Sequence, residues 1–294
     1  MRTRLHWCFL AFVALAFSGC VKHSVVVKVN RDGTGVVHVR HFEEVPTGLF
    51  AANSAKEKPP RIPSQEQVDA LAKAMGEGVV ARPVKRAKDA NGWEGYEILF
   101  DVKDVNKLVL NQASLKELTT PNTEKEDGEE ATRGKDEDSL SPELVDSATL
   151  RELKIRMRAG VLTLQPKFGG GARPAEIGET IDPFAGSAGT GGFASKVALS
   201  VGSQFLGAAR LGFFVQVESG IQQTDAQFVR GKQIAIMNVN LGQLASPKNL
   251  EANLALLDEL TAVSGQSKKR TQEICREIKG LDVDMNEKIT VKLK

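Results

Sequence analysis

The sequence predicts an α+β fold with a mainly antiparallel sheet built from hairpins with interspersed helices, followed by C-terminal helices. Two observations predict this class. Runs rich in β-branched residues occur in pairs around short turns that contain Gly, and amphipathic helical segments interrupt these pairs instead of following every strand. The 294 residues, of which 41% are hydrophobic and 26% charged, are enough for one large or two modest domains.

The first expected element is a hairpin over residues 24–42. Two Val-rich runs flank Asp32-Gly33, a strong turn sequence because Gly adopts a positive φ at no steric cost. Period-two alternation then places five valines where they can face one another, with Val25, Val27 and Val29 opposite Val37 and Val39.

A helix is expected from Ser64 to the glycines at 76 and 78. Ser64 and Gln67 have the spacing of a capping box, in which each residue bonds the backbone of the other. The apolar stripe of this helix consists of Val68, Leu71, Ala72 and Met75.

The remaining elements follow from the same two signals, alternation for strands and period 3.6 for helices. Strands are expected at 79–88 and 93–102 around a turn at 89–92, with Tyr96, Ile98 and Phe100 on one face, and then a helix or loop at 104–118. A second hairpin is expected at 153–168 around Ala159-Gly160, and an element of undecided type at 193–206. Strands at 211–217 and 233–241 with turns at 218–220 and 225–231, helices at 249–260 and 268–279, and a strand at 288–293 complete the chain.

Two segments lack the composition of a packed core. Residues 121–138 carry eight acidic and three basic side chains, so a disordered acidic loop is expected. Residues 169–192 are rich in Gly and small residues, which predicts a linker or a mobile lid. We therefore expect an α+β domain over 20–168, and over 193–294 strands that either complete the same sheet or form a second domain, followed by the C-terminal helices and final strand.

The N-terminus has the three parts of a secretory signal. Arg2 and Arg4 precede an apolar run at 5–17, which is too short to cross a bilayer, and Ser18-Gly19 supplies the small residues of a cleavage site. The next residue is Cys20, and residues 17–20 resemble the lipobox of bacterial lipoproteins, with Phe17 where Leu is usual. The resemblance implies a signal peptide over 1–19 and a Cys20 thiol that carries fatty acyl chains such as palmitate. An ordinary secretory signal with a chance Cys is the alternative.

A lipid on Cys20 implies a location. Two chains and an acylated amine anchor a protein where one chain does not suffice. The resemblance then implies a membrane protein held by its lipid on the periplasmic side of the cell envelope. Because Val21 follows Cys20, it implies the outer membrane if the cell is Gram-negative.

Three segments together resemble the mycobacterial LppM-like family of envelope lipoproteins. They are the hairpin with Asp32-Gly33-Thr34-Gly35 after Cys20, the run 95–101, and the run 214–221 followed by 231–236. Here Glu218-Ser219-Gly220 stands for a Pro-Gly turn of that family, and Ile236 for a common Trp. The resemblance implies an envelope-facing domain that binds lipid or glycolipid, and it implies no catalytic residues.

No motif for chemistry is present. The chain has no H-E-x-x-H or C-x-x-C sequence, and no phosphate loop. The hairpin brings His23 near His38 or His41, but polar strand positions are favoured over a metal site. Cys275, on a helical pattern, is expected to be a small buried residue. A net charge of +2 and 5% aromatic residues give no case for nucleic acid, and no cofactor or metal is expected.

Two short basic runs have alternative interpretations. The run Lys85, Arg86 and Lys88 suits either a solvated strand edge or contact with anionic headgroups beside the anchor. The run 268–270 suits an ordinary helix start or the same headgroups.

The favoured hypothesis is a non-enzymatic, lipid-anchored envelope protein that binds an amphiphilic ligand or a protein partner, such as a lipid or another envelope protein. One alternative is an envelope hydrolase or transferase with a scattered site, for which Asp101, Asp104 and the segment 169–192 are the candidates. The other is a structural tether between the membrane and envelope components.

Overall fold

The computed structural model describes residues 21–43, 62–111, 114, 150–168, 209–244, 246–263 and 268–294. Several predictions lie outside the described residues: the signal peptide 1–19 with Cys20, the acidic loop 121–138, the Gly-rich segment 169–192 and the element at 193–206. Residues 112, 113 and 115–118 of the predicted helix or loop at 104–118 also lie there.

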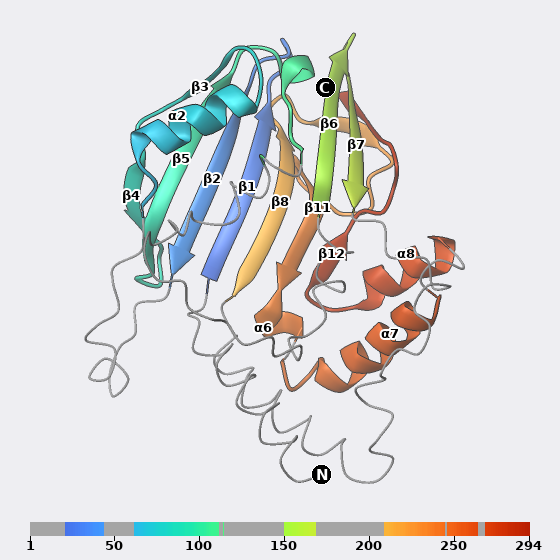
Figure 1. The fold of residues 1–294 in the computed structure, drawn as a ribbon. Coiled ribbons are helices and arrows are strands. Elements are labelled where there is room, and N and C mark those ends of the chain that lie inside the picture. Colours follow the sequence, from blue (N-terminus) through green and yellow to red (C-terminus); the bar gives the residue numbers. More distant parts are fainter. Residues whose placement is uncertain are drawn as a thin grey trace, which may run out of the picture.

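The described residues form two sheets and a few short helices, which confirms the α+β class with mainly antiparallel strands (Figure 1). The nine-stranded sheet has the order β10 (Val229–Arg230), β11 (Gln233–Asn240), β8 (Arg210–Val217), β1 (Val21–Val29), β2 (Gly35–Glu43), β5 (Glu94–Val102) and β3 (Val79–Ala81). In addition, β12 (Leu281–Val283) pairs with β11, and β4 (Lys85–Lys88) pairs with β5.

The four-stranded sheet has the order β6 (Leu150–Arg158), β7 (Val161–Phe168), β13 (Ile289–Leu293) and β9 (Ile221–Thr224). The helices are α2 (Gln65–Ala74), the 3₁₀ turn η2 (Val105–Lys107), α6 (Leu241–Leu244), α7 (Leu250–Val263) and α8 (Lys268–Glu277). Segments from both halves of the chain contribute to both sheets, since β8 lies beside β1 and β13 lies beside β7.

The predicted hairpin is confirmed in type, position and register. β1 and β2 pair antiparallel, with Val25 opposite Val39 and Val27 opposite Val37. Gly33 has φ +87° in the connecting turn, as the Asp-Gly sequence predicts. All five valines are buried.

The predicted helix after residue 63 is also confirmed with its cap. The Ser64 side chain accepts from the Gln67 backbone, and the Gln67 side chain accepts from the Ser64 backbone at 2.9 Å. The apolar stripe of α2 is buried. The second hairpin is formed by β6 and β7, and the two predicted C-terminal helices correspond to α7 and α8.

Some predicted boundaries are wrong. The strand expected at 79–88 is two short strands, β3 and β4, because Pro83 between them has no N–H to donate to a neighbouring strand. The predicted turn at 225–231 contains the two-residue strand β10, and β9 and β12 were not predicted. The largest departure is the parallel pairing of β1 with β8 in an otherwise antiparallel sheet.

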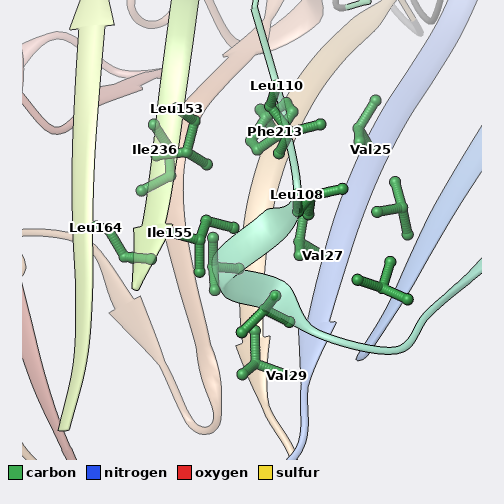
Figure 2. Packing of buried hydrophobic residues seen from close by; sticks show 14 of the residues in the cluster. Val25, Val27, Val29, Leu108, Leu110, Leu153, Ile155, Leu164, Phe213 and Ile236 are labelled. Carbon is green, nitrogen blue, oxygen red and sulfur yellow. The ribbon is translucent and has the colours of Figure 1, made fainter. Parts of the chain in front are cut away.

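The core lies between one face of the nine-stranded sheet, which we call the inner face, and the elements that cover it. The inner face comprises Val25, Val27 and Val29 of β1 and the side chains level with them on the neighbouring strands. In Figure 1, α2 crosses this face, and β6 and β7 stand in front of its β11 side. Figure 2 shows Leu153 and Ile155 of β6 packed towards Ile236 and Phe213, with Leu108 and Leu110 filling the space between the sheets.

Candidate functional site

Four strands of the nine-stranded sheet begin or end at the same end of the sheet. We call it the Cys20 end. Cys20 directly precedes Val21, the first residue of β1. Pairing places Val21 opposite Glu43, the last residue of β2, and Glu43 opposite Glu94, the first residue of β5. Arg210 begins β8 beside Lys22. Whatever fixes Cys20 therefore acts directly on this end of the sheet.

The inner face changes character at the Cys20 end. Towards the other end it is apolar, whereas here His23, His41 and Tyr96 lie side by side on β1, β2 and β5. All three are buried, with 3%, 1% and 4% of their surface exposed. The rings of His41 and Tyr96 stack with centroids 5.1 Å apart.

The two histidines and Glu43 form a hydrogen-bonded chain. His41 Nε2 lies 3.0 Å from Glu43 Oε1, and a carboxylate only accepts, so Nε2 donates. His23 Nδ1 lies 3.3 Å from His41 Nδ1, so one of these two nitrogens donates to the other. His23 Nε2 is buried without a hydrogen-bond partner in the described part of the chain.

Burial sets the titration of this cluster. Loss of hydration, with a smaller contribution from the nearby His41, lowers the pKa of His23 to about 3, so His23 is neutral at physiological pH. Burial, assisted by the charge of Glu43, raises the pKa of Tyr96 to about 12. His23 and Tyr96 are therefore both uncharged near neutral pH.

The opposite face of the sheet, which we call the outer face, carries aromatic and charged groups at the Cys20 end. Phe42, Trp93 and Ala87 pack together there. The ammonium group of Lys22 lies 3.9 Å from the centre of the Trp93 ring and 2.6 Å from a carboxylate oxygen of Asp89. The turn predicted at 89–92 thus holds the positive charge nearest to Cys20 in a cation–π and ion-pair contact.

Arg210 is the second cation of this outer face. Its Nε donates to Oδ1 of Asn238 at 2.9 Å, and its guanidinium carbon lies 5.7 Å from the centre of the Phe214 ring. Asn238 is buried and donates to Asp282 at 2.7 Å. The side chain of Arg210 itself is exposed.

The structure tests several predicted residues. His23 meets His41 and not His38, because the hairpin register places His38 on the outer face, 3.7 Å from Glu97. Within the described residues no group of three His, Cys, Asp or Glu side chains is placed to hold a metal ion. Cys275 is buried, as predicted, and burial raises the pKa of its thiol.

The two aspartates proposed for a hydrolase serve structural contacts. Asp101 receives two hydrogen bonds from Arg82, at 2.6 and 2.8 Å. Asp104 caps η2 by accepting from the backbone of Asn106 at 2.9 Å. The segment 169–192 lies outside the described residues.

The two basic runs occupy the places that their simpler interpretations give them. Lys85, Arg86 and Lys88 form the edge strand β4, where Lys88 pairs with Glu94 at 2.6 Å. The run 268–270 begins α8, where Arg270 pairs with Glu259.

Two parts of this end were missed from the sequence. Arg210 and Asn238 come together through the pairing of β8 with β11, and Arg210 reaches Lys22 only through the parallel pairing of β8 with β1. No local sequence pattern predicts either strand pairing. The contact of His41 with Glu43 could have been predicted from the sequence, since residues i and i+2 share one face of a strand.

Comparisons with known proteins add one weak likeness. No protein-family model and no curated protein sequence matches this chain. Among solved structures, the NMR structure of the folded domain of LppM from Mycobacterium tuberculosis is similar with a TM-score of 0.31 and 11% sequence identity, covering 76% of this chain and 84% of that one. A likeness at this level carries no argument about function. In the part of the chain that the structure describes, no helix combines the length and apolar character needed to cross a bilayer.

Proposed function

We propose that the protein is a non-enzymatic lipoprotein of the bacterial envelope, anchored through acyl chains on Cys20, whose α+β domain binds a lipid or an envelope protein at the membrane surface. The observation that carries this proposal is the position of β1. This strand lies between β8 and β2 in the nine-stranded sheet and begins at the residue that follows Cys20.

The position of β1 makes the anchor short. A single residue step spans at most about 3.6 Å, so acyl chains on Cys20 leave no linker between bilayer and sheet. β1 has a neighbour on each side, and Val25, Val27 and Val29 are fully buried. A lipid on Cys20 therefore holds the Cys20 end of the sheet against the headgroups and fixes which part of the domain faces the membrane.

The proposed absence of catalysis is supported by the structural contacts of the polar side chains that were the candidates for a hydrolase site. Asp101 and Asp104 are held by Arg82 and Asn106, in partly exposed positions that lack the full burial by which enzymes tune carboxyl groups. The buried polar cluster of His23, His41 and Tyr96 with Glu43 contains no Ser, Thr or Cys side chain.

The test compares the native protein with Cys20→Ser in its own cells. Fatty acylation at Cys20, measured by mass spectrometry of protein purified from membranes, supports the proposal. We expect Cys20→Ser to lose the acyl mass and to move from the membrane fraction to the soluble fraction. Cys275→Ser is the matched control, because it removes the remaining cysteine of the processed chain and should leave fractionation unchanged.

Two results would overturn the proposal. One is an unmodified Cys20 in the native protein, and the other is a Cys20→Ser variant that stays in the membrane fraction. A lipid or protein that is retained after mild extraction would identify what the domain binds.

A further inference from the structure

Arg210 lies close to the point at which Cys20 would enter the bilayer. Two residue steps separate Cys20 from Lys22, at most about 7 Å of chain. Lys22 is the register partner of Arg210 on the neighbouring parallel strand, and neighbouring strands lie about 4.8 Å apart. A membrane surface that holds Cys20 is therefore within reach of the long side chain of Arg210.

The guanidinium group is held in place before any ligand arrives. Its Nε hydrogen is used by Asn238, whose amide is fixed in turn by Asp282. The Phe214 ring lies under the guanidinium, and its own position depends on Gly212, because a Cβ at Gly212 would collide with Cε2 of the ring. The side chain of Arg210 is therefore largely ordered in the unbound protein, and it loses little further conformational entropy when it binds a ligand.

The outer donors of Arg210 have no acidic partner among the described residues. The contact with Asn238 occupies Nε, which leaves the four Nη hydrogens, and nearby Asp282 already accepts from Asn238 and Arg230. An exposed guanidinium with its fork free presents parallel N–H groups that match two oxygens of a phosphate.

The acidic groups at the Cys20 end are already engaged. Glu43 accepts from His41, Asp89 from Lys22, and Glu94 pairs with Lys88. The charge of Arg210 is therefore not opposed by an unengaged carboxylate on these strand ends.

We infer that Arg210 binds the phosphate of an anionic phospholipid in the membrane to which Cys20 is attached. This inference rests on the proposed function, since it is the nearness of Cys20 that favours a lipid phosphate over the carboxylate of a partner protein. The contact adds a second attachment point beside the acyl chains. It turns the outer face, with Lys22 and Trp93, towards the headgroups and fixes the orientation of the domain.

The test uses the chain from residue 20 with Cys20→Ser, so that no acyl chain contributes to binding. Every buried residue of the described core lies after Cys20, so this chain retains that core. Flotation with vesicles of phosphatidylcholine, with and without added phosphatidylglycerol, measures partition. We expect a preference for the anionic vesicles that high salt removes. Arg210→Gln should weaken partition to them about fivefold, which corresponds to about 1 kcal/mol for one basic residue at an anionic surface.

Two further variants separate the guanidinium from general charge. Arg210→Lys keeps the charge but loses the fork, so its partition should fall between those of the parent and Arg210→Gln. Lys292→Gln removes one exposed charge from β13 in the other sheet and should match the parent. Circular dichroism of each variant confirms that it is folded.

The inference is overturned if Arg210→Gln and Lys292→Gln weaken partition equally, or if the parent chain shows no preference for anionic vesicles. Binding of Arg210 to a partner protein instead of a lipid would give one of these two results. The proposed function fails separately, on an unacylated Cys20 in native membranes, a result that the vesicle assay does not depend on.

Discussion

The inner and outer faces of the nine-stranded sheet are made from the same strands but carry side chains with different kinds of contact. On β5, the inner face carries Phe100, which is fully buried, while the next residue along, Asp101, lies on the outer face and pairs with Arg82. The inner face is closed by α2 and the second sheet. The outer face instead satisfies its charges by ion pairs between neighbouring strands, such as that of Arg40 with Glu97 at 3.0 Å.

The comparison shows which face of the sheet provides stability and which face can carry a function. Apolar burial on the inner face gives the free energy of folding, since each buried methylene contributes about 0.8 kcal/mol. Exposed ion pairs contribute little. The exposed charged residues of the outer face can therefore change with little loss of stability, whereas His23 and His41 are buried polar groups on the inner face. The predictions below test this division.

The largest expected effect is on the inner face. Phe100→Ala should lower the free energy of unfolding by about 3–5 kcal/mol, because this fully buried side chain would leave a cavity in the core. Urea denaturation followed by circular dichroism measures the change. Leu99→Ala, one residue away on the outer face, is the matched control and should cost about 1 kcal/mol, since its side chain is only partly buried. Equal losses would refute the assignment of the core to one face.

The second prediction concerns the polar part of the inner face. The pKa of His23 is about 3 in the folded protein against 6.5 in the unfolded chain, so the unfolded chain binds the extra proton between these values. Stability should therefore fall as pH drops below 6.5, by up to about 1.4 kcal/mol per pH unit from this residue. His23→Gln removes the titration, and at pH 4.5 it should recover about 2–3 kcal/mol of the loss.

Urea denaturation at several pH values measures this difference. His38→Gln is the comparison on the outer face. Burial, with help from Arg40, also lowers the pKa of His38, but the carboxylate of Glu97 opposes the shift. The recovery should have the same sign and be smaller. A pH profile of His23→Gln that parallels the native protein would show that His23 is not neutral in the fold.

The features that could be predicted from the sequence are those formed by residues close together in the chain. The β1–β2 hairpin follows from Asp32-Gly33 and the alternating valines, and its register alone brings His23 to His41. The interruption at Pro83 was visible in principle. The pairing of β1 with β8 was not, because nearly two hundred residues separate the strands and a parallel pair has no turn sequence of its own. Arg210 therefore could not be assigned to the Cys20 end from the sequence.

A third and smaller effect is expected at the helix that covers the inner face. Ser64→Ala removes the side-chain cap of α2 and should cost about 1 kcal/mol in urea denaturation. Ser64→Asp retains an acceptor at the same place and should stay within a few tenths of a kcal/mol of the native protein. Equal losses in both variants would mean that the hydroxyl group acts through some contact other than the cap.

The smallest effect is expected at Arg82 and Asp101 on the outer face. The hydrogen bonds from Arg82 lower the pKa of Asp101, so Arg82→Gln should raise that pKa towards its ordinary value, as followed by carboxyl NMR titration. A lowered carboxyl pKa stabilises the fold above the unfolded value and ceases to do so as pH falls through the folded one. Because both side chains are about half exposed, the urea midpoint at neutral pH should hardly move. A large destabilisation by Arg82→Gln would show that this face is covered in the folded protein, and the division between the two faces would then be wrong.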